Sequence, residues 1–260
     1  MMGSSHALTG WCAGLLAAPA LGQHDLAGAL LVATACAGFA LLPDLDHRGS
    51  TASRLFGPVT GALSWAVRTS SAVIYRATKG PRDEPGSGTH RTFWHTAAAA
   101  ALLGVATGVG TQAGGRWAVL AVLLLGVLLA MTALGDLVLL PVAVVVVVWL
   151  TETGLGPAAL AQLDEVAGWL GYAVALGCLV HDLGDALTEH GCPILWPIPI
   201  RGETFYELRP PDLLRFRTRG PAEIALVAVV FTPAAFLLIP GVWPVVWPRL
   251  EPLISTALPW

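Results

Sequence analysis

Long stretches of this chain are apolar and carry almost no charge. Residues 117–132 hold no ionisable side chain, and several other windows of about 15 to 20 residues are nearly as apolar. A helix needs ~20 apolar residues to cross the hydrocarbon core of a bilayer. Of the 260 residues, 55% are apolar and only 12% are charged, which is unusual for a soluble domain. The chain is therefore predicted to be an integral membrane protein.

The spans are predicted to be helical, because the apolar runs do not alternate with polar residues as the strands of a membrane barrel must. We expect an all-α fold, a polytopic transmembrane helical bundle of about six or seven spans. The candidate spans are residues 7–22, 26–42, 96–112, 117–132, 135–150, 166–183 and 221–240.

The basic residues determine the expected orientation. Twelve of the fourteen Lys and Arg residues lie in two loops, 48–91 and 201–219. The positive-inside rule assigns both loops to the cytoplasm. Four predicted spans separate the loops, and an even count returns the chain to the same side. The N-terminus then also faces the cytoplasm, and the acidic segment 151–166 lies on the opposite face of the inner (plasma) membrane.

Two parts of the chain are distinguished. Residues 1–220 are expected to form a membrane-embedded domain. Within it, the cytoplasmic loop 48–90 has apolar residues at mostly helical spacing with basic residues between them, which favours either an interfacial helix or a helix packed on the bundle. Residues 221–260 are expected to form a last span and a Trp- and Pro-rich tail that lies outside or in the interface. The basic loops suit anionic lipid headgroups, and we find no nucleic-acid motif.

Histidines and carboxylates gather at the predicted cytoplasmic ends of the spans. Every histidine except His24 lies there, in segments such as "PDLDH", "HRTFWH" and "HDLGDALTEH". Four separate segments thus deliver ligand-type groups to one membrane face. The candidate metal ligands are His6, Asp44, Asp46, His90, His95, His181 and Asp185.

A histidine beside a span is by itself more often an interfacial residue than a ligand. The pair His181 and Asp185 is harder to explain in this way, because positions four apart share one helix face. Ionisable groups at membrane depth are costly and usually functional. Asp44 and Asp46 are two residues apart, so an extended chain would point both side chains the same way.

A mixed set of imidazoles and carboxylates suits a divalent metal, with Zn favoured and Mn or Fe as alternatives. The set exceeds what one tetrahedral ion needs, so one or two ions are expected, and two fit better.

Further roles are assigned around these ligands. Arg91 is predicted to hold a substrate phosphate with its planar guanidinium. His47 is a further ligand or a proton shuttle, and Glu189 and His190 are reserve acid or base candidates. Thr188 is expected to orient a ligand or water from the face of His181. No C-x-x-C pair occurs, so Cys12, Cys36, Cys178 and Cys192 are expected to be small core residues.

These motifs together carry a family resemblance. "GSSHALTG", "PDLDH", "HRTFWHT" and "HDLGDALTEHGCPILWPIPI" follow one another over residues 3 to about 200. In this order they resemble the YdjM family of inner-membrane-associated metal-dependent hydrolases, in its actinobacterial form. The similarity of some members to zinc-dependent phospholipase C implies phosphoester chemistry. The resemblance implies that the family's motif residues map onto His6, Asp44, Asp46, His47, His90, His95, His181 and Asp185.

The sequence therefore predicts a membrane-bound metal-dependent hydrolase that acts on a phosphoester or lipid-like substrate through metal-activated water. Its expected partners are membrane lipids and a lipid or phosphorylated substrate. One alternative is a transporter or metal-ion carrier, because intramembrane His and Asp also mark ion paths. A carrier would place polar groups at mid-depth in several spans, whereas here they gather at one end. The other alternative is a structural membrane protein whose metal pins its loops together.

Overall fold

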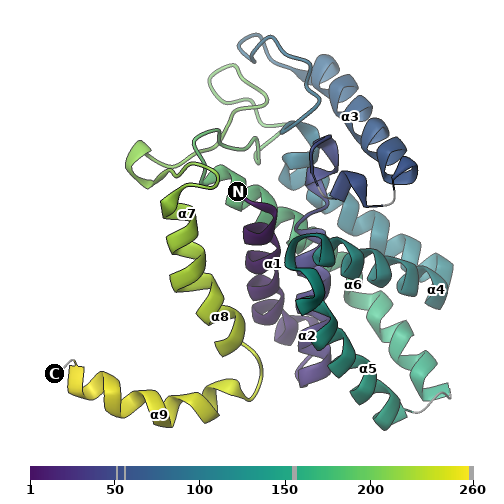
Figure 1. Ribbon diagram of the computed structural model, residues 1–260. Helices are drawn as coiled ribbons and strands as arrows, with labels where there is room; N and C mark the ends of the chain where they lie inside the picture. Colours follow the sequence, from purple (N-terminus) through teal and green to yellow (C-terminus); the bar gives the residue numbers. More distant parts are fainter. Residues whose placement is uncertain (51, 56, 154–156, 258–260) are drawn as a thin grey trace.

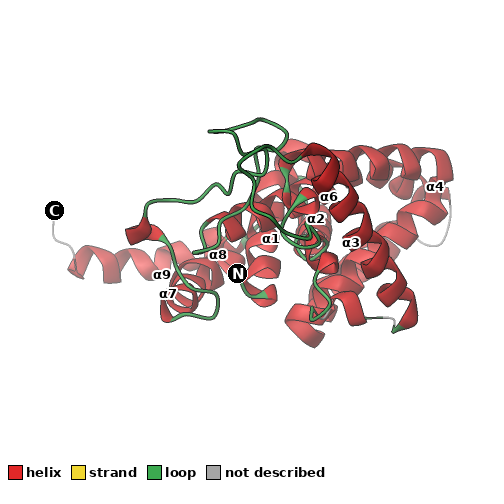
Figure 2. Ribbon diagram, turned by 90° about the horizontal axis from the view of Figure 1, so that it is seen from above, coloured by secondary structure: helices red, strands yellow, loops and turns green. Residues whose placement is uncertain are grey.

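The computed structural model describes residues 1–50, 52–55, 57–153 and 157–257. Within these residues the regular structure is helical, with three isolated β-bridges, so the expected all-α fold is confirmed (Figure 2). The longer helices are α1 Gly3–Ala17, α2 Leu26–Phe39, α3 Pro58–Thr78, α4 Ala97–Leu134, α5 Leu139–Thr153, α6 Pro157–Ala186 and α9 Val242–Ala257. The short helices are η1 Ala18–Leu21, η2 Pro43–Asp46, η3 Ala52–Arg54, η4 Phe93–His95, η5 Gly135–Val138, η6 Asp212–Leu214, α7 Pro221–Leu226, η7 Val227–Phe231 and α8 Thr232–Leu237.

Three helical stretches of the described chain are long and apolar enough to cross a membrane: Leu26–Asp46, Ala97–Glu152 and Leu160–Ala186. A bent pair, Pro221–Leu237 and Val242–Arg249, makes a fourth if its halves, which meet at 118°, count as one span. The chain thus has apolar helices of membrane-spanning length, while the expected count of six or seven crossings stays a prediction.

The stretch Ala97–Glu152 covers three of the expected spans, and its breaks lie where the sequence predicts links between them. At Gly115 the backbone leaves the helical conformation with φ 59° and ψ −154°. At Gly135, where α4 ends, φ is 62°. Positive φ values are accessible to glycine at little cost, and both positions use this freedom. The start of α6 differs from expectation, because the helix already begins at Pro157 and takes in residues 157–166 of the acidic segment; residues 154–156 lie outside the described residues.

The helices α2 and α6 form the centre of the bundle, and α4 and α5 form its outer side. In the most apolar windows of α2 and α6, 72% and 61% of the residues are buried, against 22% in the stretch of α4 and α5. That outer stretch also has the highest mean hydropathy, 2.6. An apolar surface of this kind suits contact with lipid tails rather than with water.

Glycines allow the central helices to approach closely. A Cβ added at Gly177 of α6 would lie 2.8 Å from the carbonyl oxygen of Cys36 in α2. One added at Gly104 of α4 would lie 2.7 Å from the carbonyl oxygen of Gly171 in α6. Small residues at helix contacts are the usual means of packing helices in a membrane, where no hydrophobic force drives helix against helix.

The N-terminus, α3 and the long loop after α6 lie at the same end of the bundle (Figure 1). Two loops at this end are tied together by Asp83, whose carboxylate accepts hydrogen bonds from the amides of Gly80, Thr204 and Phe205 at 2.6, 3.0 and 3.0 Å. This polar end carries both of the basic loops.

The helix predicted within loop 48–90 is present as α3, and its polar side faces the bundle. Ser71 is fully buried and shares a hydrogen bond of 2.6 Å with Thr92. Val59, Trp65 and Val73 point outward with exposed fractions of 71%, 64% and 56%. The sequence left two alternatives, a helix packed on the bundle and an interfacial helix. The polar side of α3 packs on the bundle, as the first requires, and its apolar side is exposed, as the second requires.

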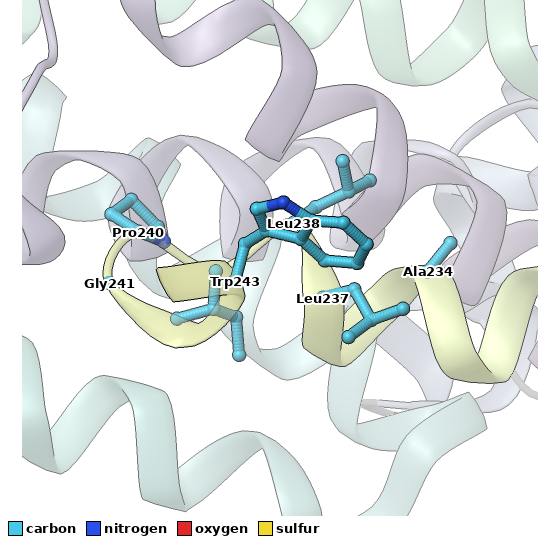
Figure 3. Close-up of a pocket in the computed structure, with 7 residues that line it drawn as sticks. Ala234, Leu237, Leu238, Pro240, Gly241 and Trp243 are labelled. Atoms are coloured by element: carbon cyan, nitrogen blue, oxygen red, sulfur yellow. The ribbon is translucent and has the colours of Figure 1, made fainter. Parts of the chain in front are cut away.

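Helix α8, in the C-terminal part of the chain, packs against α1. The indole of Trp11 donates a hydrogen bond of 3.1 Å to the carbonyl of Ala235 in α8. After α8 the chain turns sharply into α9, and Figure 3 shows Trp243 beside Leu237 and Leu238 at this bend, where a cavity of about 560 Å³ is lined by apolar residues. The expected span is thus a helix with a π-helical turn, and the expected tail is a second helix; residues 258–260 lie outside the described residues.

Candidate metal centre

Four separate elements carry ligand-type side chains to the polar end of the bundle. His6 lies in the first turn of α1, Asp44 and Asp46 lie in η2 directly after α2, and His95 ends η4 just before α4. His181 and Asp185 lie in the last turns of α6. The elements meet because α2 and α6 pack at the centre of the bundle and α1 packs on both.

The seven predicted ligands fall into three overlapping groups, and each group could hold a metal ion. Within a group, one ligand atom from every residue lies within 4.8 Å of the others. His181 belongs to two groups and His95 to two. The groups are His6 with His181 and Asp185, Asp44 with His95 and His181, and Asp46 with His90 and His95.

Asp185 is the centre of the first group. Its side chain is 1% exposed, so its charge depends on neighbouring cations or polar hydrogens. Among the described residues, its carboxylate oxygens lie close to Arg91 Nη2 at 2.9 Å, His6 Nε2 at 3.3 Å, His181 Nε2 at 3.6 Å, His95 Nε2 at 4.0 Å and the Met1 amino nitrogen at 2.5 Å.

Asp46 connects the loop before α4 to the site. Its oxygens accept hydrogen bonds from His90 Nδ1 at 2.6 Å and from the backbone amide of Arg91 at 3.1 Å. Its Oδ2 also lies 3.6 Å from His95 Nδ1. Asp46 thus fixes the position of His90 and of the residue that pairs with Asp185, and it lies beside His95.

The expectation that Asp44 and Asp46 leave the span in an extended chain is wrong. Pro43 starts a 3-10 helix, and in such a helix two residues spaced two apart point in different directions. Asp44 therefore faces His181, whose Nε2 is 3.9 Å away, while Asp46 faces His90. The two carboxylates therefore belong to different groups and do not point the same way.

The orientation of His181 leaves its Nε2 available to bind a metal ion. Its Nδ1 lies 2.8 Å from the carbonyl oxygen of Ala40, and because a carbonyl only accepts, Nδ1 carries the proton. Metal-binding histidines usually make such a hydrogen bond with the other ring nitrogen. The ring stacks on His6 with centroids 3.8 Å apart, so the two imidazoles are held together.

Several buried ring nitrogens of the site have no hydrogen-bond partner among the described residues: His6 Nδ1, both nitrogens of His95, and His181 Nε2. The three rings are at most 1% exposed. Buried polar atoms are nearly always paired, because an unpaired one costs roughly 1–3 kcal/mol. A bound metal ion would satisfy His181 Nε2 and one nitrogen of His95, since a neutral imidazole offers one lone pair, so the donor set fits a divalent cation.

The charge state of His95 also fits a ligand. Burial lowers the pKa of His95 well below its usual value, and the neighbouring His181 adds to the effect. His95 is therefore neutral at neutral pH, which is the form in which imidazole binds metal ions.

The site is closed on the side of α1 and α6 and more open on the side of the loops. His6, His181 and Asp185 are buried, whereas His90 is 37% exposed and Asp44 is 25% exposed. A small molecule could approach the second and third groups from this side.

The other predicted residues lie at different distances from the site. The ring of His47 lies 5.0 Å from that of His90 and is exposed, so it flanks the third group. Glu189 is exposed and lies 3.6 Å from Arg217, outside the three groups. His190 is likewise exposed. Thr188 does not face the site as expected, because α6 ends at Ala186 and the Thr188 hydroxyl donates to the carbonyl of Asp185 at 2.7 Å.

Two further residues of the "HDLGD" motif are buried, and one of them, Gly184, has a structural role that the sequence did not assign. Asp182 is fully buried, and neither of its oxygens has a hydrogen-bond partner among the described residues. A Cβ added at Gly184 would lie 3.2 Å from two ring atoms of His6, so the glycine makes room for that imidazole. No local sequence pattern indicates this contact, because His6 lies in α1, far from Gly184 in sequence.

No curated protein and no solved structure matches this chain. The model of one family, described as YdjM inner membrane protein, matches residues 1–244. The match extends past the sequence motifs, which end near residue 200, and takes in α7 and α8. Because it covers most of the 260 residues, the chain belongs to the YdjM inner membrane protein family.

Proposed function

We propose that this inner membrane protein is a metal-dependent hydrolase that acts on a phosphoester or lipid-like substrate. The observation that carries the proposal is the convergence of the three His and carboxylate groups at one end of the bundle, with Arg91 among them. We further propose that this end faces the cytoplasm, because both basic loops lie there.

Zinc is the metal we propose, as one or two ions, because imidazole and carboxylate together are ligands that zinc accepts readily. His6, His181 and Asp185 would hold one ion, and Asp46, His90 and His95 a second, with Asp44 beside them. When bound, such ions polarise a phosphoryl oxygen and lower the pKa of water toward neutrality.

The chain's own residues would position the substrate and the proton. Arg91 is 23% exposed and lies 2.9 Å from Asp185, so its guanidinium reaches both the site and the open side. A planar guanidinium can hold two phosphate oxygens at once. His47, exposed beside His90, would take up or release the proton at its Nε2, since its Nδ1 accepts a hydrogen bond from the amide of Gly49 at 3.1 Å.

The open side distinguishes this proposal from a structural metal site. A structural site is closed by its protein ligands, whereas a catalytic site keeps a position for water or substrate. The exposure of His90 and Asp44 supports the second type. A carrier is supported less well, because the site groups gather at the helix ends.

The test is an activity screen of the purified protein on phosphomonoesters, phosphodiesters and phospholipids, with zinc and after chelation. Asp185→Asn keeps the side-chain volume and removes a ligand charge. We expect hydrolysis to fall steeply, and the melting temperature to fall as well, because Arg91 and the Met1 amino group lose their buried counter-charge. His24→Ala is the control, because His24 is exposed between α1 and α2, at the other end of α1 from His6. Unchanged turnover with a large drop in melting temperature for Asp185→Asn would instead indicate a structural metal.

A further inference from the structure

A second pocket lies on the polar end of the bundle, between the loop that follows η2 and the first turns of α3. Its volume is about 570 Å³. Three arginines, two serines and one tryptophan dominate its lining: Arg48, Arg54, Arg68, Ser53, Ser64 and Trp65. None of these residues belongs to the metal groups.

The pocket is strongly basic and holds no acidic lining residue among the described residues. No described carboxylate forms an ion pair with Arg48, Arg54 or Arg68. Arg54 is held in place by a hydrogen bond of 2.7 Å to the carbonyl of Gly49. Three arginines that line one pocket without a counter-charge suit an oxyanion, and a phosphate group accepts several hydrogen bonds from guanidinium groups at once.

Apolar side chains continue from this pocket along the outer side of α3. Trp65 lines the pocket and is 64% exposed. Val73, about two turns further along α3 and about 80° from Trp65 around the helix axis, is 56% exposed. Tryptophan beside basic and aliphatic residues is typical of a surface that lies at the level of the lipid headgroups. A ligand for the whole surface would combine a phosphate with apolar chains.

We propose that this pocket binds the phosphate headgroup of an anionic phospholipid, with the acyl chains along the outer side of α3. Arg48 directly follows His47, whose ring lies 5.0 Å from His90, so the bound headgroup would lie next to the third metal group. Binding of the lipid requires neither metal nor hydrolysis, so it can be tested independently of the proposed enzyme activity.

The experiment measures binding of phosphatidic acid and of phosphatidylcholine to the full chain in detergent, by native mass spectrometry, with a chelator present. The test variant is Arg48→Gln with Arg68→Gln. Its matched control is Arg76→Gln with Lys79→Gln, which removes the same charge at the other end of α3. We expect the test variant to weaken phosphatidic acid binding by about thirtyfold, since it removes two basic groups and each such group near anionic lipid contributes about 1 kcal/mol. The control should change binding by less than about twofold, because its residues do not line the pocket.

Three results would overturn the proposal. Equal losses in both double variants would indicate unspecific attraction to negative charge. Equal binding of the two lipids in the unaltered protein would remove the role of the headgroup charge. Displacement by inorganic phosphate at concentrations equal to those of phosphatidic acid would indicate a site for soluble phosphate. If the double variant does not fold, phosphatidic acid binding is measured on the single variants Arg48→Gln and Arg68→Gln instead. Thermal unfolding checks that each of them is folded.

Discussion

Gly184→Ala tests whether His6 is a metal ligand without altering any ligand. The added Cβ would lie 3.2 Å from Cε1 and Nδ1 of His6 and 2.7 Å from Sδ of Met1. The Met1 side chain is flexible and can move aside. The His6 ring cannot easily retreat, because it stacks on His181 at 3.8 Å and its Nε2 lies 3.3 Å from Asp185. The substitution should therefore displace the imidazole.

The expected effects on stability and on metal binding differ in size. Overpacking costs about 1–3 kcal/mol, and replacing a helical glycine by alanine returns about 1 kcal/mol, so the free energy of unfolding should fall by about 0–2 kcal/mol. Displacing a ligand typically weakens metal binding by about 10–100-fold, even when the substituted residue is not itself a ligand. A loss of zinc affinity of about 10–100-fold corresponds to about 1.4–2.7 kcal/mol, against about 0–2 kcal/mol for the free energy of unfolding, so zinc affinity is the more sensitive measurement.

The assay is a calorimetric zinc titration of the metal-free protein together with thermal unfolding of the same preparation. Gly168→Ala is the matched control on the same helix, because a Cβ there would meet no atom within 4 Å. It should leave zinc affinity unchanged and gain up to about 1 kcal/mol of stability. If Gly184→Ala binds zinc as tightly as the unaltered protein, His6 is not a ligand and the reasoning is wrong.

Three further predictions concern the loops at the polar end. Arg91→Lys should keep the fold but lower kcat/KM for a phosphoester by at least about tenfold, or 1.4 kcal/mol, because an ammonium cannot grip two phosphate oxygens; an unchanged kcat/KM would exclude the phosphate role. Asp83→Ala leaves three amide donors without their acceptor, so unfolding stability should fall by about 1–3 kcal/mol and protease cleavage in loop 80–90 should rise, whereas unchanged cleavage would show that Asp83 does not tie the loops. Glu84→Cys should resist a membrane-impermeant thiol reagent in intact cells and react after lysis, and the four native cysteines are buried and should stay silent; efficient labelling from outside would reverse the orientation.

Much of the fold could be predicted from the sequence, because long apolar runs with almost no charge indicate helices that contact lipid. The helical class and the breaks at Gly115 and Gly135 agree with the predicted links. The ligand set could be anticipated because ionisable groups are too costly near a bilayer to occur there without a partner. All seven proposed ligands indeed lie in the three groups that the fold brings together.

Features that depend on packing between elements could not be predicted in this way. Pro43 converts the segment of Asp44 and Asp46 into a 3-10 helix, although the spacing alone suggested an extended chain. The end of α6 at Ala186 turns Thr188 into a residue that bonds the backbone of Asp185 instead of one that faces the site. The role of Gly184 depends on α1, which is distant in sequence, and no local pattern indicates that contact.

The metal content of the purified protein tests the central claim most directly. Mass spectrometry of the zinc bound per chain should give one or two equivalents, and His181→Ala should lose most of it, because His181 belongs to two of the three groups. His24→Ala should keep the full content, since His24 is exposed and belongs to none of them. A protein without stoichiometric metal, or a folded His181→Ala variant that holds as much metal as the unaltered chain, would contradict the account.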